Sequence, residues 1–73
     1  MNMENRMEEL GNLLSELEGK SKASPQQLNL LFDLNNHFYP QLLEYSKHCT
    51  SCVARTYKRM KNHYNAYGKI IKN

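Results

Sequence analysis

Two segments of the chain carry the same hydrophobic pattern, with an apolar residue at every third or fourth position. The first segment contains Met3, Met7, Leu10, Leu14 and Leu17, and Leu13 widens its stripe. The second segment contains Val53, Tyr57, Met60, Tyr64 and Tyr67. Because an α-helix turns once in about 3.6 residues, this spacing places each set on one helical face. The pattern predicts helices over about residues 2–18 and 51–67.

Glycines and hydroxyl residues mark the expected ends of these two helices. Gly19 and Gly68 follow the apolar stripes, and glycine commonly ends a helix because it tolerates a left-handed backbone. Thr50 or Ser51 precedes the second stripe, and either side chain is suited to cap the first free amides. Gly11 lies inside the first segment, where a glycine weakens a helix.

A third helix is predicted between these two, over residues 25–39. Its start is Ser24-Pro25-Gln26-Gln27, in which Ser caps the helix, Pro suits its first position and the second Gln completes a capping box. Its apolar residues form one face with Leu28, Leu31, Phe32, Phe38 and Tyr39, and a nearly opposite pair with Leu30 and Leu34. A helix that is apolar on two sides is covered on both. This helix is therefore either the middle element or half covered by another molecule.

Two connections complete the chain. Residues 19–24 are a short linker, and Pro40 breaks the middle helix and opens a connection over residues 40–50. Within that connection we expect Gln41–Tyr45 to form a turn or two of helix, with Leu42 and Leu43 facing inward. No segment has the pattern of a strand. The sequence predicts one all-α domain over residues 1–73, built as a small three-helix bundle or an open helical hairpin assembly.

Length and composition limit what such a domain does. The chain has 73 residues, of which 40% are hydrophobic, and a core of this size supplies about 3–5 kcal/mol without a disulfide, a metal or a partner. We therefore expect stabilisation by protein partners in a larger assembly, with homo-oligomerisation left open. So short a chain is poorly able to shape a catalytic cleft, and we expect a protein that is not an enzyme.

No membrane span or export signal is visible in the sequence. No apolar run approaches the ~18 residues that a spanning helix needs. The N-terminus alternates acids with Met and Leu, whereas a signal peptide places an apolar stretch after a basic start. We expect no membrane partner, and a location inside the cell (the host cytoplasm) or in a virion.

The net charge of +3 conceals a gradient along the chain. Residues 1–20 contain five acids and two bases, whereas residues 47–73 contain seven bases and no acid. Off the apolar stripe of the last helix lies a set that we call the basic face: Arg55, Lys58, Arg59, Lys61 and Asn62. Such a face is suited to nucleic-acid phosphates or to an acidic protein surface. The simplest interpretation is a face that is solvated or that meets the acidic first helix of the same chain.

Apolar residues of the first two helices are also candidate contacts for a partner helix. They are Met3, Met7, Leu10, Leu14, Leu17, Leu30 and Leu34. The first helix either packs on the last helix or projects into a groove on a partner, where Met and Leu are adaptable anchors. The sequence favours packing on the last helix.

Cys49 and Cys52 form a C-x-x-C pair at the expected start of the last helix. A helix N-terminus lowers the pKa of a thiol, so a redox or metal role is physically reasonable. Zinc needs four ligands, and His37 is the one credible third ligand, because His63 lies about 16 Å further along the helix. The favoured interpretation is two small thiols packing a tight turn. The sequence thus predicts no cofactor and no catalytic residue, with Cys49, Cys52 and His37 as candidates for structural zinc.

A set of short motifs lies between Leu31 and Tyr64. They are Leu31-Phe32-Asp33-Leu34-Asn35-Asn36, Phe38-Tyr39-Pro40, Tyr45-Ser46-Lys47, Cys49-x-x-Cys52, Arg55, Tyr57 and Lys61-Asn62. Together they resemble small helical proteins of tailed bacteriophages, particularly the crAss-like phages. The resemblance covers under half of the chain. It implies a phage accessory or virion protein attached to a capsid, portal or tail component, and it supplies no functional residues.

We therefore expect a non-enzymatic structural or interaction module, of the kind found as an accessory protein in a phage virion. One alternative is a small nucleic-acid-binding protein that uses the basic face. Another is a zinc- or thiol-dependent regulator that uses Cys49 and Cys52.

Overall fold

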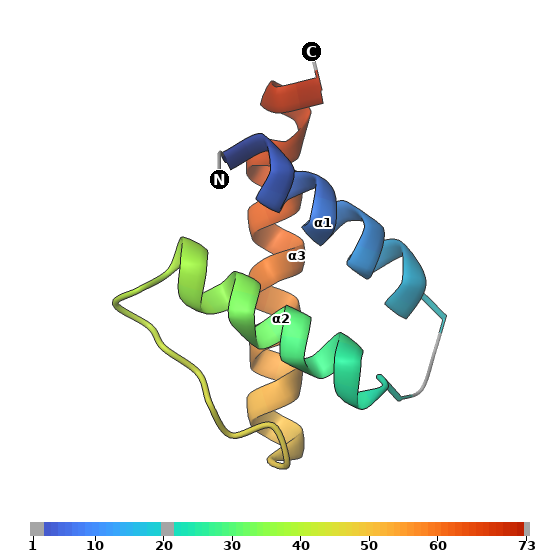
Figure 1. The fold of residues 1–73 in the computed structure, drawn as a ribbon, viewed down its shortest axis with the longest axis vertical. Coiled ribbons are helices and arrows are strands. Elements are labelled where there is room, and N and C mark those ends of the chain that lie inside the picture. Colours follow the sequence, from blue (N-terminus) through green and yellow to red (C-terminus); the bar gives the residue numbers. More distant parts are fainter. Residues whose placement is uncertain (1–2, 20–21, 73) are drawn as a thin grey trace.

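Each helix of the described chain packs against the other helices. The structure, a computed structural model, describes residues 3–19 and 22–72, with side chains at 5–19 and 22–67. Within that part of the chain the elements are α1 (Met3–Leu17), α2 (Pro25–Phe38) and α3 (Thr50–Lys72), without a strand. α1 and α2 both lie across the same side of α3 (Figure 1). The predicted all-α class is confirmed, in the form of the three-helix bundle.

Local sequence signals set the ends of α1 and α2. Gly19 has a positive φ of 81°, so it takes the left-handed backbone that follows a helix. The capping box of α2 is present: Ser24 Oγ accepts from the Gln27 amide at 3.2 Å, and Gln27 Oε1 accepts from the Ser24 amide at 2.8 Å. α2 ends at Phe38, one residue earlier than predicted, because Tyr39 precedes Pro40 and leaves the helical region with φ −129° and ψ 69°.

Both predicted ends of α3 are wrong. The helix continues through Gly68 to Lys72, because a glycine inside a helix costs only about 1 kcal/mol relative to alanine. At the start, Cys49 holds the capping position in place of Thr50 or Ser51. Its carbonyl accepts from the Val53 amide at 2.9 Å and its Sγ from the Cys52 amide at 3.2 Å. No helix in residues 3–19 and 22–72 is both long and apolar enough to cross a membrane.

The connection over residues 39–49 also differs from the prediction. After a turn in which the Leu42 amide donates to the Tyr39 carbonyl at 2.9 Å, no helix forms at Gln41–Tyr45. Leu42 and Leu43 face outward, 47% and 49% exposed, and the side chain that turns inward is Glu44. The physical reason is that side chains of α2 bind the backbone of this segment and replace the hydrogen bonds that a helix would make.

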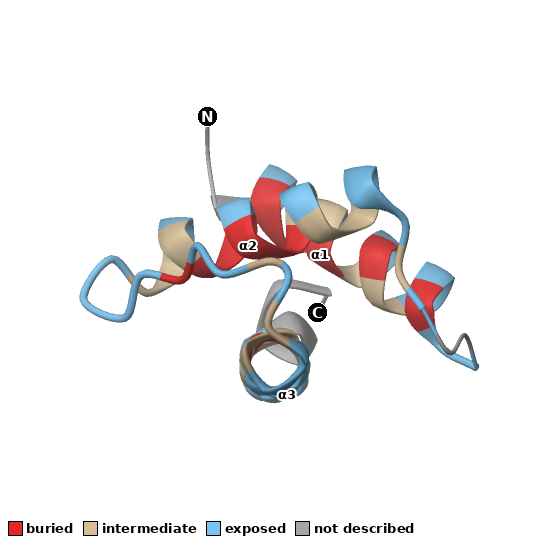
Figure 2. Ribbon diagram, turned by 90° about the horizontal axis from the view of Figure 1, so that it is seen from below, coloured by how far each residue is buried: buried red, intermediate tan, exposed pale blue. Residues whose placement is uncertain are grey.

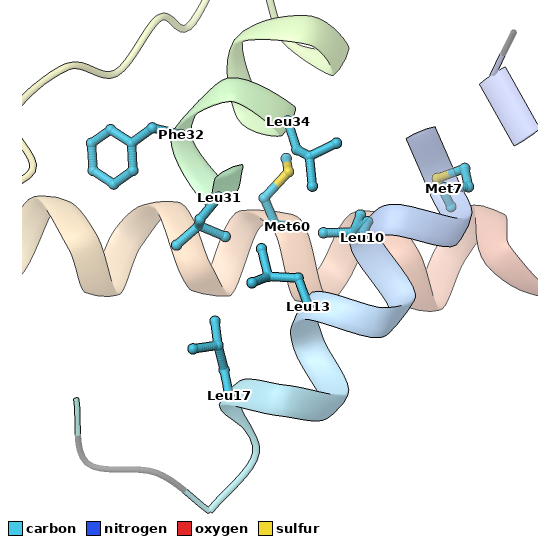
Figure 3. Packing of buried hydrophobic residues seen from close by; sticks show 8 residues of the cluster. All are labelled: Met7, Leu10, Leu13, Leu17, Leu31, Phe32, Leu34 and Met60. Atoms are coloured by element: carbon cyan, nitrogen blue, oxygen red, sulfur yellow. The ribbon is translucent and has the colours of Figure 1, made fainter. Parts of the chain in front are cut away.

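One hydrophobic cluster fills the space between the three helices. Its buried members are Met7, Leu10, Leu13, Leu17, Leu31, Phe32, Leu34 and Met60. Figure 3 shows Met60 of α3 projecting from one side toward the leucines of α1 and α2. α1 therefore packs within the chain, and the buried side chains of Met7, Leu10, Leu17 and Leu34 are used in this core. Leu14 and Leu30 are half-buried at its edge, and the side chain of Met3 lies outside the described residues.

α1 approaches α3 closely at Gly11. A Cβ atom at this position would lie 2.7 Å from Tyr64 Oη and 2.9 Å from two carbons of the same ring. The glycine that appeared in the sequence as a weak point of the first helix thus leaves room for a tyrosine of α3. Glycine lowers the stability of the helix itself, but its missing Cβ allows the two helices to come into close contact here.

A buried arginine links α1 to α2. The Arg6 side chain is 11% exposed, and its guanidinium donates to Glu9 Oε1 at 2.9 Å and to Asp33 Oδ2 at 2.7 Å. The hydrogen bond to Asp33 raises the pKa of Arg6 above its ordinary value. Glu9 of α1 and Asp33 of α2 therefore have a basic partner on α1 itself.

Candidate interaction site around Glu44 and the basic face

The structure divides the basic face into two parts. α3 lies beneath the layer formed by α1 and α2, and the side of α3 that faces away from this layer is exposed (Figure 2). Lys58, Lys61 and Asn62 are exposed. Arg55 and Arg59 instead reach the 39–49 connection, where both contact Glu44. The five residues therefore do not act as one surface.

Arg55 and Arg59 hold the Glu44 carboxylate from two successive turns of α3. Arg55 donates from Nε to Oε2 at 2.9 Å and from Nη2 to Oε1 at 3.0 Å. Arg59 donates from Nη1 to Oε2 at 3.2 Å, and the same nitrogen donates to Asn35 Oδ1 at 2.8 Å. Two parallel bonds between a guanidinium and a carboxylate fix geometry as well as charge. The sequence suggested the acidic first helix as the intramolecular partner, and that suggestion is wrong for these two arginines.

Two asparagines of α2 hold the backbone on either side of the carboxylate. Asn36 Oδ1 accepts from the Glu44 amide at 2.8 Å, and Asn36 Nδ2 donates to the Glu44 carbonyl at 3.1 Å. Asn35 Nδ2 donates to the Leu42 carbonyl at 3.0 Å and to Asn36 Oδ1 at 2.9 Å. We call the set Asn35, Asn36, Glu44, Arg55 and Arg59 the Glu44 clamp. It joins α2, the connection and α3.

The charges of the clamp stabilise one another. The hydrogen bonds from Arg55, followed by that from Arg59, lower the pKa of Glu44 below its ordinary value although the carboxylate is buried. The bond to Glu44 correspondingly raises the pKa of Arg55. A buried carboxylate with these partners is ionised at neutral pH and has its oxygens occupied. The clamp therefore offers no free acid or base for catalysis and acts as a structural joint.

The connection that carries Glu44 exposes apolar side chains to solvent. Leu42, Leu43 and Tyr45 surround the buried Glu44 in sequence and are 47%, 49% and 71% exposed. Large apolar side chains clustered on a surface commonly mark a contact site. Here the segment that carries them is fixed at its backbone by Asn35 and Asn36. We call Leu42, Leu43 and Tyr45 the apolar loop.

Two cations of the basic face are exposed and form no ion pair in the described part of the chain. Among the described residues, Lys58 and Lys61 have no ion-pair partner, and no acid lies anywhere on α3. Lys58 lies between Arg55 and Arg59 in sequence and Lys61 follows them, so the exposed lysines alternate with the clamp arginines along α3. The exposed part of the basic face therefore consists of Lys58, Lys61 and Asn62.

Cys49 and Cys52 lie together at the start of α3, as the spacing predicts. Both are free thiols and both are half-buried. Hydrogen bonding to Cys52 and then to Ser51 lowers the pKa of Cys49 to about 7, whereas the hydrogen bond to Cys49 raises the pKa of Cys52. In the described part of the chain, no three His, Cys, Asp or Glu side chains gather where they would hold a metal ion. His37 lies elsewhere, with its ring against Phe38 at a centroid distance of 4.9 Å.

An aromatic group surrounds His63 on the α2-facing side of α3. Its ring lies 4.4 Å from Phe38, 5.3 Å from Tyr39 and 4.8 Å from Tyr67 between centroids. Its Nδ1 is 3.0 Å from Tyr39 Oη. Burial lowers the pKa of His63. Tyr67, whose side chain is the last one described on α3, thus packs its ring against His63 although it is half exposed.

A shallow apolar hollow of about 250 Å³ lies where α1 ends and α3 begins. Its lining consists of Leu17, Gly19, Lys22, Ala23, Leu28, Leu31, Val53 and Tyr57. The lining holds no acid, histidine or cysteine, and its titratable side chains are Lys22 and Tyr57.

The residues that organise this region were missed in the sequence. Asn35 and Asn36 lie in the last turn of α2, and Glu44 is the only acid after Asp33. Two adjacent asparagines inside a helix are a signal of side-chain hydrogen bonds to nearby backbone. A lone acid near a basic segment is similarly a signal of an internal ion pair. Neither signal identifies its partner without the fold.

No family model, no curated protein and no solved structure matches the chain. The geometry of the Glu44 clamp, the apolar loop and the exposed lysines is therefore the basis for a functional proposal.

Proposed function

We propose that this chain is a non-enzymatic structural and interaction module that binds a protein surface through the apolar loop and the exposed lysines of α3. The observation that carries the proposal is the fixed backbone beneath the apolar loop. Binding costs free energy when a loop must be ordered, and a loop that is already held avoids part of that cost. Tyrosine and large apolar side chains next to cations are typical of protein interfaces.

The same surface favours a protein over a nucleic acid. An interface with nucleic acid is dominated by cations that contact phosphates. Here two of the five residues of the basic face, Arg55 and Arg59, are occupied by Glu44, and among the described residues the most exposed large hydrophobic side chain is Tyr45 of the apolar loop. Nucleic-acid binding by Lys58, Lys61 and Asn62 is the alternative.

The resemblance to small phage proteins suggests the setting. In that setting the module is a virion accessory protein, and its partner is a capsid, portal or tail component. A short chain of this kind is ordered further by its neighbours, since its own core is small. A gene position among capsid, portal and tail genes would support this setting, and a position among unrelated metabolic genes would contradict it.

Two matched pairs of variants test the binding surface. Tyr45→Ala removes the most exposed residue of the apolar loop, and Tyr67→Ala removes an exposed tyrosine outside it. Lys61→Glu reverses a charge on the basic face, and Lys22→Glu makes the same reversal in the linker. Each tagged chain is produced in infected cells, and its incorporation into purified particles is measured by quantitative mass spectrometry. We expect Tyr45→Ala and Lys61→Glu to reduce incorporation at least tenfold and both controls to leave it unchanged.

Cross-linking of the intact particles locates the partner. Lysine cross-links from Lys58 and Lys61 to one structural protein support the proposal, and particles without the chain overturn the virion setting. Titration of duplex DNA over a salt series addresses the alternative. Affinity that falls steeply with salt and is lost in Lys61→Glu but not in Lys22→Glu would favour nucleic acid, whereas absent binding leaves the protein surface as the target.

A further inference from the structure

The two cysteines at the start of α3 form an arrangement that the interaction surface does not use. Cys49 is the capping residue of the helix, since its carbonyl accepts the first helical hydrogen bond from Val53 at 2.9 Å. Its Sγ accepts from the Cys52 amide at 3.2 Å and lies 3.3 Å from Ser51 Oγ. The sulfur therefore occupies the place of a capping oxygen, and an amide and a hydroxyl both approach it.

This position stabilises negative charge on Cys49. Unpaired amides and the helix dipole at an N-terminus favour an anion. Hydrogen bonding to Cys52 and to Ser51 lowers the pKa of Cys49 to about 7. At neutral pH, Cys49 is then a thiolate in about half of the molecules, whereas an ordinary cysteine is a thiolate in a few per cent of them. The charged side chain that faces the pair is Arg55, which interacts with Cys52 from the same helix and is itself held by Glu44.

Cys52 has the complementary character. It lies one helical turn after Cys49, and the hydrogen bond to Cys49 raises its pKa. One thiol is thus ionised and the other protonated while both remain half-buried and accessible from solvent. In the described residues no third ligand joins them to hold a metal. A dithiol without further ligands is suited to exchange with disulfides.

We propose that Cys49 and Cys52 form a thiol–disulfide exchange site whose co-reactant is an organic disulfide, with Cys49 as the attacking residue and Cys52 as the resolving residue. The Cys49 thiolate attacks one sulfur of the disulfide R–S–S–R. A bond forms between Cys49 Sγ and that sulfur, which gives the mixed disulfide Cys49–Sγ–S–R. The S–S bond of the co-reactant breaks, and the leaving thiolate R–S⁻ takes a proton from solvent.

The second step closes the pair. Cys52 loses its proton to solvent and attacks Cys49 Sγ, which forms the Cys49–Cys52 disulfide and releases the second R–S⁻, which is protonated. Overall the two cysteines are oxidised and the disulfide is reduced to two thiols. The reduced form of the pair keeps a thiolate in the capping position, and the oxidised form loses it. Stabilisation of the reduced thiolate makes such a disulfide a readily reduced one.

The test uses the full chain and glutathione disulfide as the probe. Cys49 and Cys52 are trapped by alkylation after defined times, and the products are assigned by mass spectrometry across a pH series. In Cys52→Ser the mixed disulfide with glutathione should accumulate at Cys49. Its rate of formation should be half-maximal at a pH below the midpoint of an ordinary cysteine and should exceed that of Cys49→Ser by about three- to fivefold at neutral pH, since the larger thiolate fraction outweighs the weaker nucleophilicity of each thiolate. The natural chain should pass instead to the intramolecular disulfide.

Denatured chains provide the matched control. In concentrated urea the helix N-terminus is lost, so the two single variants should react at equal rates with a midpoint near that of an ordinary cysteine, about 8.5. The proposal is overturned if Cys49 in the folded chain behaves as it does in urea. It is also overturned if the folded chain forms only intermolecular disulfides over all ratios of reduced to oxidised glutathione.

Discussion

Arg55 and Glu44 form a two-point contact, with Nε 2.9 Å from Oε2 and Nη2 3.0 Å from Oε1. The carboxylate comes from an extended connection and the guanidinium from the second turn of α3. This contact closes the chain segment between α2 and α3 onto the helix that follows it. It also turns Glu44 inward, which leaves Leu42, Leu43 and Tyr45 directed to solvent. The position of the apolar loop thus follows from one ion pair and its asparagine supports.

Replacement of Glu44 by glutamine should lower the stability of the fold. The glutamine side chain would keep the shape of the original but would leave Arg59, whose side chain is 19% exposed, without its negative partner. Loss of hydrogen bonds to charged groups in a buried site costs about 2–3 kcal/mol. The free energy of unfolding in urea measures this loss. The exposed Glu8→Gln is the control and should change it by no more than about 0.5 kcal/mol; equal effects of the two variants would show that the clamp is not structural.

The contribution of Glu44 should depend on pH in a defined direction. Its pKa in the folded chain lies below the ordinary value of 4.5, chiefly through Arg55, so the unfolded chain takes up the proton first as the pH falls. The stabilisation is complete above about 4.5 and is lost as the pH falls through the folded-state pKa. The difference in unfolding free energy between the natural chain and Glu44→Gln should therefore shrink below that pH. A difference that grows on acidification would contradict the ion pair.

Gly11→Ala should have opposite effects in two backgrounds. In the natural chain the new Cβ would lie 2.7 Å from Tyr64 Oη, and the overpacking, typically about 1–3 kcal/mol, exceeds the gain in helix propensity of about 1 kcal/mol. We expect a net loss of about 1 kcal/mol. In Tyr64→Ala the obstruction is gone, and the same substitution should stabilise the chain by about 1 kcal/mol. Urea denaturation of the four proteins in this double-mutant cycle measures the coupling, and additive effects would show that the two residues do not meet.

His63 should titrate below its ordinary range in the folded chain. The cause is burial, so folding favours the neutral ring and stability falls as the pH drops below about 6.5. NMR titration of the imidazole in the folded and urea-unfolded chains measures the shift. Because burial and not the hydroxyl is responsible, Tyr39→Phe should retain the lowered pKa. Tyr67→Ala removes a ring 4.8 Å away and should move the pKa back toward that of the unfolded chain.

Local signals in the sequence were sufficient to predict those features of the structure that depend only on residues adjacent in sequence. The capping box at Ser24 and Gln27, the left-handed Gly19 and the break before Pro40 all depend on contacts within four residues. The apolar periodicity also identified the face of α1 that packs, although Leu13 is more deeply buried than Leu14 of the predicted stripe. A period alone does not decide between adjacent positions, because the crossing angle of the neighbouring helix selects which of them is covered.

Three features of the candidate site required the tertiary structure. The division of the basic face into bound arginines and exposed lysines depends on where Glu44 lies, and Glu44 is eleven residues from Arg55 in sequence. The outward direction of Leu42 and Leu43 depends on Asn35 and Asn36. Their side chains bind the backbone of this segment, for which the local sequence is compatible with either a turn or a helix. The role of Cys49 as a cap depends on the path by which the connection enters α3.

By itself, the sequence determined that this protein is built of helices with one apolar face each, because backbone hydrogen bonding and side-chain periodicity are local. It also determined that charge is segregated toward α3 and that two thiols share one helical turn. Only the tertiary structure decided which charges are paired inside the fold and which remain exposed. Long side chains such as Arg55 and Glu44 find each other through space, and their pairing is set by the packing of helices that the local sequence does not specify.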